Sequence, residues 1–370
     1  MPINYSISIL KNKKTLQKKI LKWFDSHKRD LPWRRTKDPY AIWISEFMLQ
    51  QTQVEQVIPY YHRFLKRFPD VFSLANASLD NVMKVWEGMG YYRRAKYLYN
   101  AAKIIVSEYK GIVPNDYEAL RQLPGFGNYT TGSVLSIAYN QPYPAVDGNV
   151  IRVAARLLKI TKVIDTTIIK KIITPFIFDL IPDGKASDFN QALMELGALV
   201  CRPAKPDCRQ CCWKHACLAF HEMNDPSVLP KRKKKIRGEI RHIAVAVVVK
   251  NRKILIARRP DNVILGNLWE FPGGKQKKEE SIEDACLREV REETGITIRI
   301  TNPIMSFKHH YSHYSIVLHF FYGRYLGGRL KNRKTTKLRW VPMQELTRFA
   351  FPKANQRVIS RIFEDYGVSD

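Results

Sequence analysis

Four cysteines near the middle of the chain have the spacing of a metal site. They are separated by six, two and five residues, and they are Cys201, Cys208, Cys211 and Cys217. Four thiolates bind either an iron–sulfur cluster or a tetrahedral zinc ion. The spacing does not decide between the two, because His215 could replace one thiolate at zinc. Cys212 falls outside the pattern, and we expect it to take no part. Such clustering favours a metal centre over disulfides.

A second group of chemically suggestive residues is acidic. Glu289, Glu292 and Glu293 lie at positions i, i+3 and i+4 of a helix expected over 281–294. Like charges on one helix face repel each other. A magnesium ion bound by the carboxylate oxygens would remove that cost and could present a pyrophosphate. The plainer interpretation is a solvated acidic helix.

A glycine-containing turn and an aspartate form the third group. Leu123-Pro124-Gly125-Phe126-Gly127 separates two helical patterns. Glycine permits the close backbone approach that a phosphate needs, and the start of the following helix favours an anion. Asp147 stands just before another helical pattern, where an N-cap is the usual role. A buried carboxylate there could also face an electron-poor sugar.

The overall charge indicates a polyanionic partner. The 370 residues include 62 Lys and Arg against 34 Asp and Glu, a formal net charge of +28. Such an excess is self-repelling unless a polyanion binds, and nucleic acid is the leading candidate. At 45% hydrophobic residues the chain can form real cores, so global disorder is excluded. The longest clean apolar stretch, Ile243–Val249, is far short of a membrane span, and the start of the chain lacks the layout of a signal peptide.

The hydrophobic pattern divides the chain into a helical part and a strand-rich part. Helical spacing is followed by strands from Ile240 onward, and the helices are expected near 40–48, 54–61, 78–87, 91–109, 130–139, 148–158, 187–200 and 281–294. Between the first two helices, the polar run 49–53 interrupts the apolar stripe. We expect an all-α domain over 15–226 with a metal loop at 201–217, a basic linker over 227–240, and an α/β domain over 241–370.

Taken together, these segments resemble a known family. The turn at 123–127, Val-Asp-Gly-Asn-Val at 146–150 and the cysteine spacing resemble the helix–hairpin–helix DNA glycosylases that carry a 4Fe–4S cluster. Leu-Pro-Trp-Arg at 31–34 and Trp-Ile-Ser-Glu-Phe-Met-Leu-Gln-Gln-Thr-Gln-Val at 43–54 are similar to the adenine DNA glycosylases of A/G mismatches. The resemblance covers roughly residues 20–220 and implies iron–sulfur rather than zinc.

The resemblance assigns roles to individual residues. It implies that Glu46 is the general acid that protonates N7 of a flipped adenine, and that Asp147, oriented by Asn149, stabilises an oxocarbenium-like sugar. Tyr129 stands where lyase-competent relatives have a lysine, which implies base removal without strand cleavage. Gly125 and Gly127 would approach the DNA backbone. The remaining residues implied to contact DNA or the flipped base are Arg34, Gln191, Leu49, Gln51, Thr52 and Tyr91.

The second half resembles another family. The acidic helix with Trp269–Gly274 and Phe351–Asn355 is similar to Nudix hydrolases of 8-oxo-dGTP, although Arg339 stands where they have a glutamate. Adenine glycosylases carry a Nudix-like C-terminal domain, usually without an intact catalytic box. Tyr311-Ser312-His313 resembles the loop with which they read 8-oxoguanine in DNA, which implies binding by Ser312 and His313.

We therefore expect a monofunctional glycosylase that removes adenine opposite 8-oxoguanine or guanine in duplex DNA. We expect it to be monomeric, cytoplasmic and nucleoid-associated, with a 4Fe–4S cluster and, in the Nudix-like domain, a candidate Mg²⁺ site. Three alternatives stay open. They are an iron–sulfur glycosylase/lyase for oxidised pyrimidines, a fusion enzyme that also hydrolyses 8-oxo-dGTP, and a non-catalytic DNA-binding protein.

Overall fold

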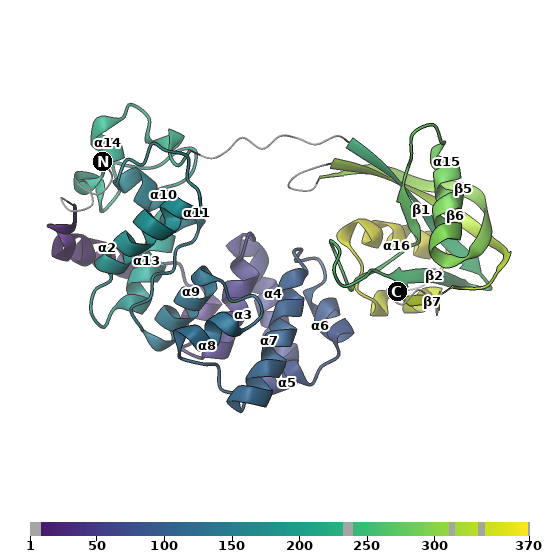
Figure 1. Cartoon of the computed structure of the whole chain (residues 1–370), viewed down its shortest axis with the longest axis horizontal. Coiled ribbons are helices and arrows are strands. Elements are labelled where there is room, and N and C mark those ends of the chain that lie inside the picture. Colours follow the sequence, from purple (N-terminus) through teal and green to yellow (C-terminus); the bar gives the residue numbers. More distant parts are fainter. Residues whose placement is uncertain (1–8, 232–239, 311–314, 332–336, 369–370) are drawn as a thin grey trace. The chain divides into compact units, whose positions relative to one another are not determined.

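The computed structural model describes residues 9–231, 240–310, 315–331 and 337–368. It contains two compact units, Met1–Asn76 with Tyr97–Lys234, and Ala77–Lys96 with Lys235–Asp370. Helices make up the first unit, whereas the C-terminal residues of the second form a sheet with helices against it (Figure 1). The expectation of a helical domain followed by an α/β domain is therefore confirmed.

The helical part has short connections and begins with α2. Its longer helices are α2 (Lys13–His27), α3 (Pro39–Leu49), α4 (Val54–Arg67), α7 (Arg93–Tyr109), α9 (Asn128–Tyr139), α10 (Gly148–Leu157) and α13 (Ala186–Leu199). The shorter ones are α5 (Val71–Ala75), α6 (Leu79–Trp86), α8 (Tyr117–Gln122), α11 (Thr166–Ile168), α12 (Thr174–Leu180) and α14 (Leu218–Glu222). Single turns lie at η1 (Pro32–Arg34), η2 (Ile169–Ile173), η3 (Lys214–Ala216) and η4 (Pro226–Val228). None of the helices in the described ranges is both long and apolar enough to cross a membrane.

The start of α3 illustrates how local sequence sets these elements. The Asp38 carboxylate accepts hydrogen bonds from the backbone N–H groups of Tyr40 and Ala41, and Pro39 occupies the first helical position. The helix ends at Leu49 and α4 begins at Val54, so the polar run 49–53 is the break that the hydrophobic pattern predicted.

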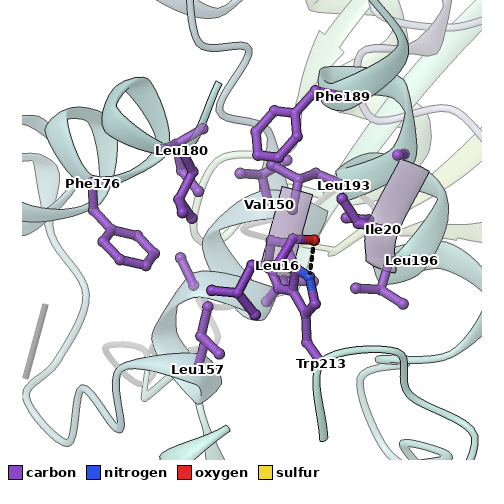
Figure 2. Packing of buried hydrophobic residues seen from close by; sticks show 14 of the residues in the cluster. Leu16, Ile20, Val150, Leu157, Phe176, Leu180, Phe189, Leu193, Leu196 and Trp213 are labelled. Atoms are coloured by element: carbon purple, nitrogen blue, oxygen red, sulfur yellow. Dashed lines mark hydrogen bonds between the residues drawn. The ribbon is translucent and has the colours of Figure 1, made fainter. Parts of the chain in front are cut away.

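One large core fixes α2, α10, α12 and α13 against each other (Figure 2). Phe189, Leu193 and Leu196 of α13 meet Leu16 of α2 there. The indole N–H of Trp213 donates a hydrogen bond of 3.0 Å to the carbonyl of Leu16. The loop that carries the cysteines is thereby attached to the first long helix.

The C-terminal part is a mixed sheet covered on both faces. Its strands are β1 (Ile240–Lys250), β2 (Lys253–Arg258), β3 (Trp269–Glu270), β4 (Gly273–Lys275), β5 (Ile296–His310), β6 (Ser315–Gly328) and β7 (Lys337–Pro342). The order is β3-β2-β1-β6-β5, with β4 on β1 and β7 on β2; β1 and β6 are parallel. Residues of α15 (Ile282–Thr294) join the core on one face and residues of α16 (Lys353–Tyr366) the core on the other. A single turn, η5 (Met343–Arg348), precedes α16.

The segment expected to begin the linker is folded against the helical part. Leu229 is buried, and its carbonyl accepts a hydrogen bond of 3.0 Å from Arg156 Nε. The carbonyl of Lys231 accepts one of 2.9 Å from the N–H of Ile164. The chain therefore stays packed at least to Lys231, and 232–239 lie outside the described residues.

Candidate active site

A cavity of about 610 Å³ opens in the helical domain. Its walls come from η1, the end of α3, the start of α4, α9, the start of α10, and α13. The lining includes many of the residues that the sequence singled out, namely Arg34, Glu46, Leu49, Gln51, Thr52, Tyr129, Asp147, Asn149 and Gln191. Positions far apart in the chain thus meet around one space that is large enough to admit a nucleobase.

Glu46 is a buried acid in this wall. The residue is only 4% exposed, and its Oε2 accepts a hydrogen bond of 2.6 Å from the Tyr129 hydroxyl. Burial raises the pKa of Glu46, and the charge of Asp147 adds to the rise. The hydrogen bonds from Tyr129 and Ser133 and the charge of Arg34 lower the pKa, but they do not cancel the effect of burial. The carboxyl therefore holds its proton to a higher pH than an ordinary glutamate.

Tyr129 remains a neutral hydrogen-bond donor. Burial and the neighbouring carboxylates of Glu46 and Asp147 raise its pKa well above the usual value. A phenol cannot form a Schiff base with an abasic sugar, and of the described residues that line the cavity none is a lysine. The arrangement orients an acid and offers no amine nucleophile.

Asp147 caps α10 and is held from several directions. Its Oδ1 accepts the backbone N–H of Val150 and its Oδ2 the amide of Asn149, both at 2.7 Å. Arg152 Nη2 in turn donates a hydrogen bond of 2.8 Å to Asn149 Oδ1, which fixes the orientation of the Asn149 amide. Burial raises the pKa of Asp147, while these hydrogen bonds and the charge of Arg152 lower it.

The two carboxyl groups have different surroundings. Asp147 receives backbone and amide donors that stabilise a carboxylate, whereas Glu46 receives two hydroxyls in a fully buried position. Burial raises the pKa of both carboxyl groups, but only Asp147 receives backbone and amide donors, which favour its ionised form. An acid and a carboxylate on one cavity are what glycosidic bond cleavage requires.

Arg34 and Gln191 line the cavity as the resemblance implied, but the residue that holds Arg34 was not anticipated. Glu195 Oε2 accepts from Arg34 Nη2 at 2.9 Å, and the same carboxylate binds Arg29. Gln191 Nε2 donates to Ser187 Oγ at 3.3 Å. The sequence signal that could have revealed Glu195 is a charged residue within the apolar helical pattern of 186–199.

Two residues implied to enter DNA have unusual backbone. Gln51, in the break between α3 and α4, has φ of 58°, and Tyr91 has φ of 47°. Left-handed backbone at a non-glycine residue is strained and tends to occur at functional sites. The Tyr91 side chain is 49% exposed, and the Arg94 guanidinium lies against its ring. Tyr91 does not line the cavity.

The glycine turn joins α8 to α9. Gly125 has φ of +83°, and a Cβ there would lie 2.7 Å from the Phe47 ring. Glycine is therefore required at this position. Gly127 is the N-cap of α9, and a Cβ there meets no described atom within 4 Å. The two helices form a hairpin whose turn leaves the start of α9 open on that side.

The four cysteines of the spacing pattern share one small cavity. The lining of that cavity also includes Arg156, which is 2% exposed and whose Nη1 donates 3.3 Å to Cys201 Sγ. Cys212 is not in that lining and instead hydrogen-bonds Cys211. Within the described ranges, no three His, Cys, Asp or Glu side chains are grouped as ligands of a single metal ion. The fit to a metal group therefore rests on the common cavity and on the cation beside a cysteine sulfur.

The acidic helix α15 has an arginine among its carboxylates. Arg288 Nη1 donates to Glu289 Oε1 at 2.7 Å and to Glu292 Oε2 at 3.1 Å, and its Nη2 donates to Glu280 at 2.7 Å. Glu293 accepts the backbone N–H of Gly273 at 3.1 Å, and burial with the charge of Glu270 raises its pKa to about 7.

The sequence also singled out Arg339, Ser312 and His313 in this domain. The Arg339 guanidinium lies against the Phe349 ring, 5.4 Å from its centroid. Ser312 and His313 lie outside the described residues.

Comparison with known proteins decides the family. The model of the HhH-GPD superfamily of base excision DNA repair proteins matches residues 44–176, and that of the NUDIX domain matches 244–361. Adenine DNA glycosylase of Buchnera aphidicola subsp. Acyrthosiphon pisum is 36% identical over 302 residues, 81% of this chain and 83% of the relative. The chain belongs to the adenine DNA glycosylases. It therefore acts in base excision repair and removes adenine from DNA by hydrolysing the N-glycosyl bond.

Further relatives and solved structures also match this chain. The mouse adenine DNA glycosylase is 32% identical, with 94% of this chain and 77% of the relative covered. The Arabidopsis thaliana enzyme is 36% identical over 68% of this chain, which spans 46% of that longer protein. A thermostable thymine-DNA glycosylase matches with a TM-score of 0.53 at 29% identity, over 57% of this chain and 98% of that structure. Endonuclease III, at 21% identity and a TM-score of 0.50, shares the fold.

Proposed function

We propose that Glu46 is the general acid and Asp147 the sugar-facing carboxylate of adenine excision. The carrying observation is that both line one cavity, where Glu46 accepts from Tyr129 and Asp147 accepts from Asn149. A flipped adenine in this cavity would lie between an acid and an anion. Arg34 and Gln191 supply donors for the base edge.

The chemistry proceeds by departure of the base. Glu46 delivers its proton to N7 of adenine, which turns the ring into a better leaving group. The bond between C1′ and N9 breaks, and its electrons leave with the adenine. Asp147 stabilises the positive charge that develops on the sugar until water adds at C1′. The raised pKa of Glu46 extends the acid form to a higher pH than in an ordinary glutamate.

A product assay tests this reaction type. Duplexes with a labelled adenine strand are incubated with the enzyme, and half of each sample is treated with alkali before electrophoresis. We expect free adenine and an abasic site, with strand breaks only after alkali. Strand breaks without alkali would contradict the assignment of Tyr129 as a residue that offers no nucleophilic amine.

The opposite base is proposed to be 8-oxoguanine or guanine. Support comes from the resemblance of residues 311–313 to the lesion-reading loop, in which a serine hydroxyl accepts the N7–H that only the oxidised base carries. Single-turnover rates on A:8-oxoG, A:G and A:T duplexes test it in the full chain. Ser312→Ala should narrow the preference for A:8-oxoG over A:G, with His313→Ala as the neighbouring variant. An unchanged ratio would exclude this role for the hydroxyl.

The four-cysteine cavity is proposed to hold a 4Fe–4S cluster through Cys201, Cys208, Cys211 and Cys217. The common lining and the Arg156 contact to Cys201 support it. When bound, the cluster supplies four sulfur–metal bonds that hold the loop 201–217 in place. That loop carries Arg202, Lys205 and Arg209, which suit DNA phosphates. Elemental analysis should find about four irons per chain; one zinc and no iron would refute this proposal.

DNA backbone contact is proposed at the α8–α9 turn. Gly125 needs its left-handed backbone, and the start of α9 beyond Gly127 is open on one side. The excess of positive charge favours search along DNA by phosphate contacts.

We propose a monomer associated with the nucleoid of the cytoplasm. Sedimentation with and without a 20–30 base-pair duplex tests the stoichiometry.

The alternative that stays open for the NUDIX domain is a second activity, Mg²⁺-dependent hydrolysis of 8-oxo-dGTP. The observation in its favour is the set Glu289, Glu292 and Glu293 on one helix, α15. Mg²⁺ bound there would polarise a phosphate oxygen. Under this alternative, the full chain with 8-oxo-dGTP and Mg²⁺ releases pyrophosphate, and Glu292→Gln abolishes the release. No release would leave the domain as a reader of the lesion.

A further inference from the structure

We infer that Glu195 is a positioning residue for excision, which holds Arg34 at the cavity wall and offsets its charge beside Glu46. This inference rests on the proposed role of Glu46. Glu195 lies on α13, whereas the residues it holds lie in the segment between α2 and α3. It was not among the residues expected from the sequence.

The contacts of Glu195 are numerous and specific. Its Oε1 accepts from the backbone N–H of Arg29 and from Arg29 Nε, both at 2.9 Å, and from Arg34 Nη1 at 3.1 Å. Its Oε2 accepts from Arg29 Nη2 and Arg34 Nη2, each at 2.9 Å. Two guanidinium groups therefore share one carboxylate in bidentate fashion. Arg34 Nη1 also donates to the carbonyl of Arg29 at 2.9 Å, which fixes its plane.

The carboxylate is deeply placed on a rigid support. The side chain of Glu195 is 1% exposed, against 31% for Arg29 and 13% for Arg34. Phe189, Leu193 and Leu196 anchor the same helix in the core (Figure 2). Burial alone would raise the pKa of Glu195, but the hydrogen bonds from Arg29 and Arg34 lower it to about 2. The two guanidinium groups therefore favour the ionised carboxylate.

Arg34 connects this ion pair to the proposed general acid. It lines the same cavity as Glu46, and its positive charge acts to lower the pKa of Glu46. The other groups that act on Glu46 are Tyr129 and Ser133 on α9 and Asp147 at the start of α10. Without Glu195, the Arg34 charge would act on Glu46 without the carboxylate that pairs with it. The negative charge of Glu195 lets Arg34 bind the base without stripping the proton from Glu46.

The test is the pH dependence of single-turnover excision from an A:8-oxoG duplex. In Glu195→Gln the basic limb of the profile should move down by about 0.5 to 1 pH unit, because the Arg34 charge is no longer offset. Glu195→Asp retains the charge and should keep the limb in place even if the plateau rate falls. Arg34→Gln should move the limb to higher pH. A purely structural role predicts lower rates and no movement of the limb.

Two controls keep the outcomes separate. Glu108→Gln removes an exposed carboxylate on α7 that does not line the cavity, and the basic limb of this variant should stay in place. If Glu195→Gln does not fold, the upward shift in Arg34→Gln decides the question. If Glu46→Gln is inactive but the basic limb stays in place in Glu195→Gln and in Arg34→Gln, the inference about Glu195 is wrong while the proposed function stands. An active Glu46→Gln would instead overturn the proposed function.

Discussion

The hydroxyl of Tyr129 lies 2.6 Å from Glu46 Oε2, although the two residues are 83 positions apart in the chain. The contact joins α9 to α3 at the wall of the cavity and fills one oxygen of the acid. Ser133 supplies a second hydroxyl to the same carboxyl group. The same phenol occupies the position at which a lysine would create a lyase, so one residue both orients the acid and withholds a nucleophile.

Removing this hydrogen bond should move the pH profile of excision. The Tyr129 donor favours the ionised form of Glu46 and so lowers its pKa. In Tyr129→Phe the pKa rises further, and the protonated acid persists to higher pH, so the basic limb should move upward. Single-turnover rates across pH measure this. Tyr139→Phe on the same helix is the control, and equal behaviour of the two variants would contradict the assigned contact.

Tyr129→Lys tests whether the phenol is what withholds a nucleophilic amine from the site. An amine at this position could attack C1′ of the sugar and form a Schiff base. The wild type should give no covalent adduct with borohydride, whereas the variant should give a detectable fraction. A high yield of trapped adduct with the wild type would contradict the absence of lyase chemistry.

Asp147→Asn should separate stability from excision. Asparagine is as good an N-cap as aspartate, so the cap of α10 is kept and the melting temperature should change little. The negative charge is lost, and the excision rate should fall by about 100-fold or more, as when other electrostatic stabilisers are removed. Asp116→Asn, at the cap of α8, is the matched control. A near-normal rate would remove Asp147 from the mechanism.

The cysteines offer an internal comparison. Cys208→Ser should lose iron and lower the melting temperature, because Cys208 lines the common cavity. Cys212→Ser should retain iron, because Cys212 is absent from that lining. Visible absorbance and iron content measure both. Loss of iron in the two variants alike would show that the ligand set is wrong.

The sequence predicted what depends on local pattern. The ranges 148–158 and 187–200 correspond to α10 and α13 within one residue at each end, because apolar spacing and caps are local signals. The resemblance also placed Glu46, Asp147 and Tyr129 at a common site, which the cavity is consistent with. The joining of Glu195 to Arg29 and Arg34 was missed. Two segments more than 160 positions apart meet there, and no periodicity in either segment reports the other.

The most direct test of the central claim is single-turnover excision by Glu46→Gln on an A:8-oxoG duplex. The amide is nearly isosteric and can accept from Tyr129, but it has no acidic proton for N7. We expect normal duplex binding with excision reduced by about 100-fold or more, within the range of general acid catalysis. Glu108→Gln, an exposed change on α7, should behave as wild type. Excision by Glu46→Gln at the wild-type rate, with adenine as the released base, would contradict the account.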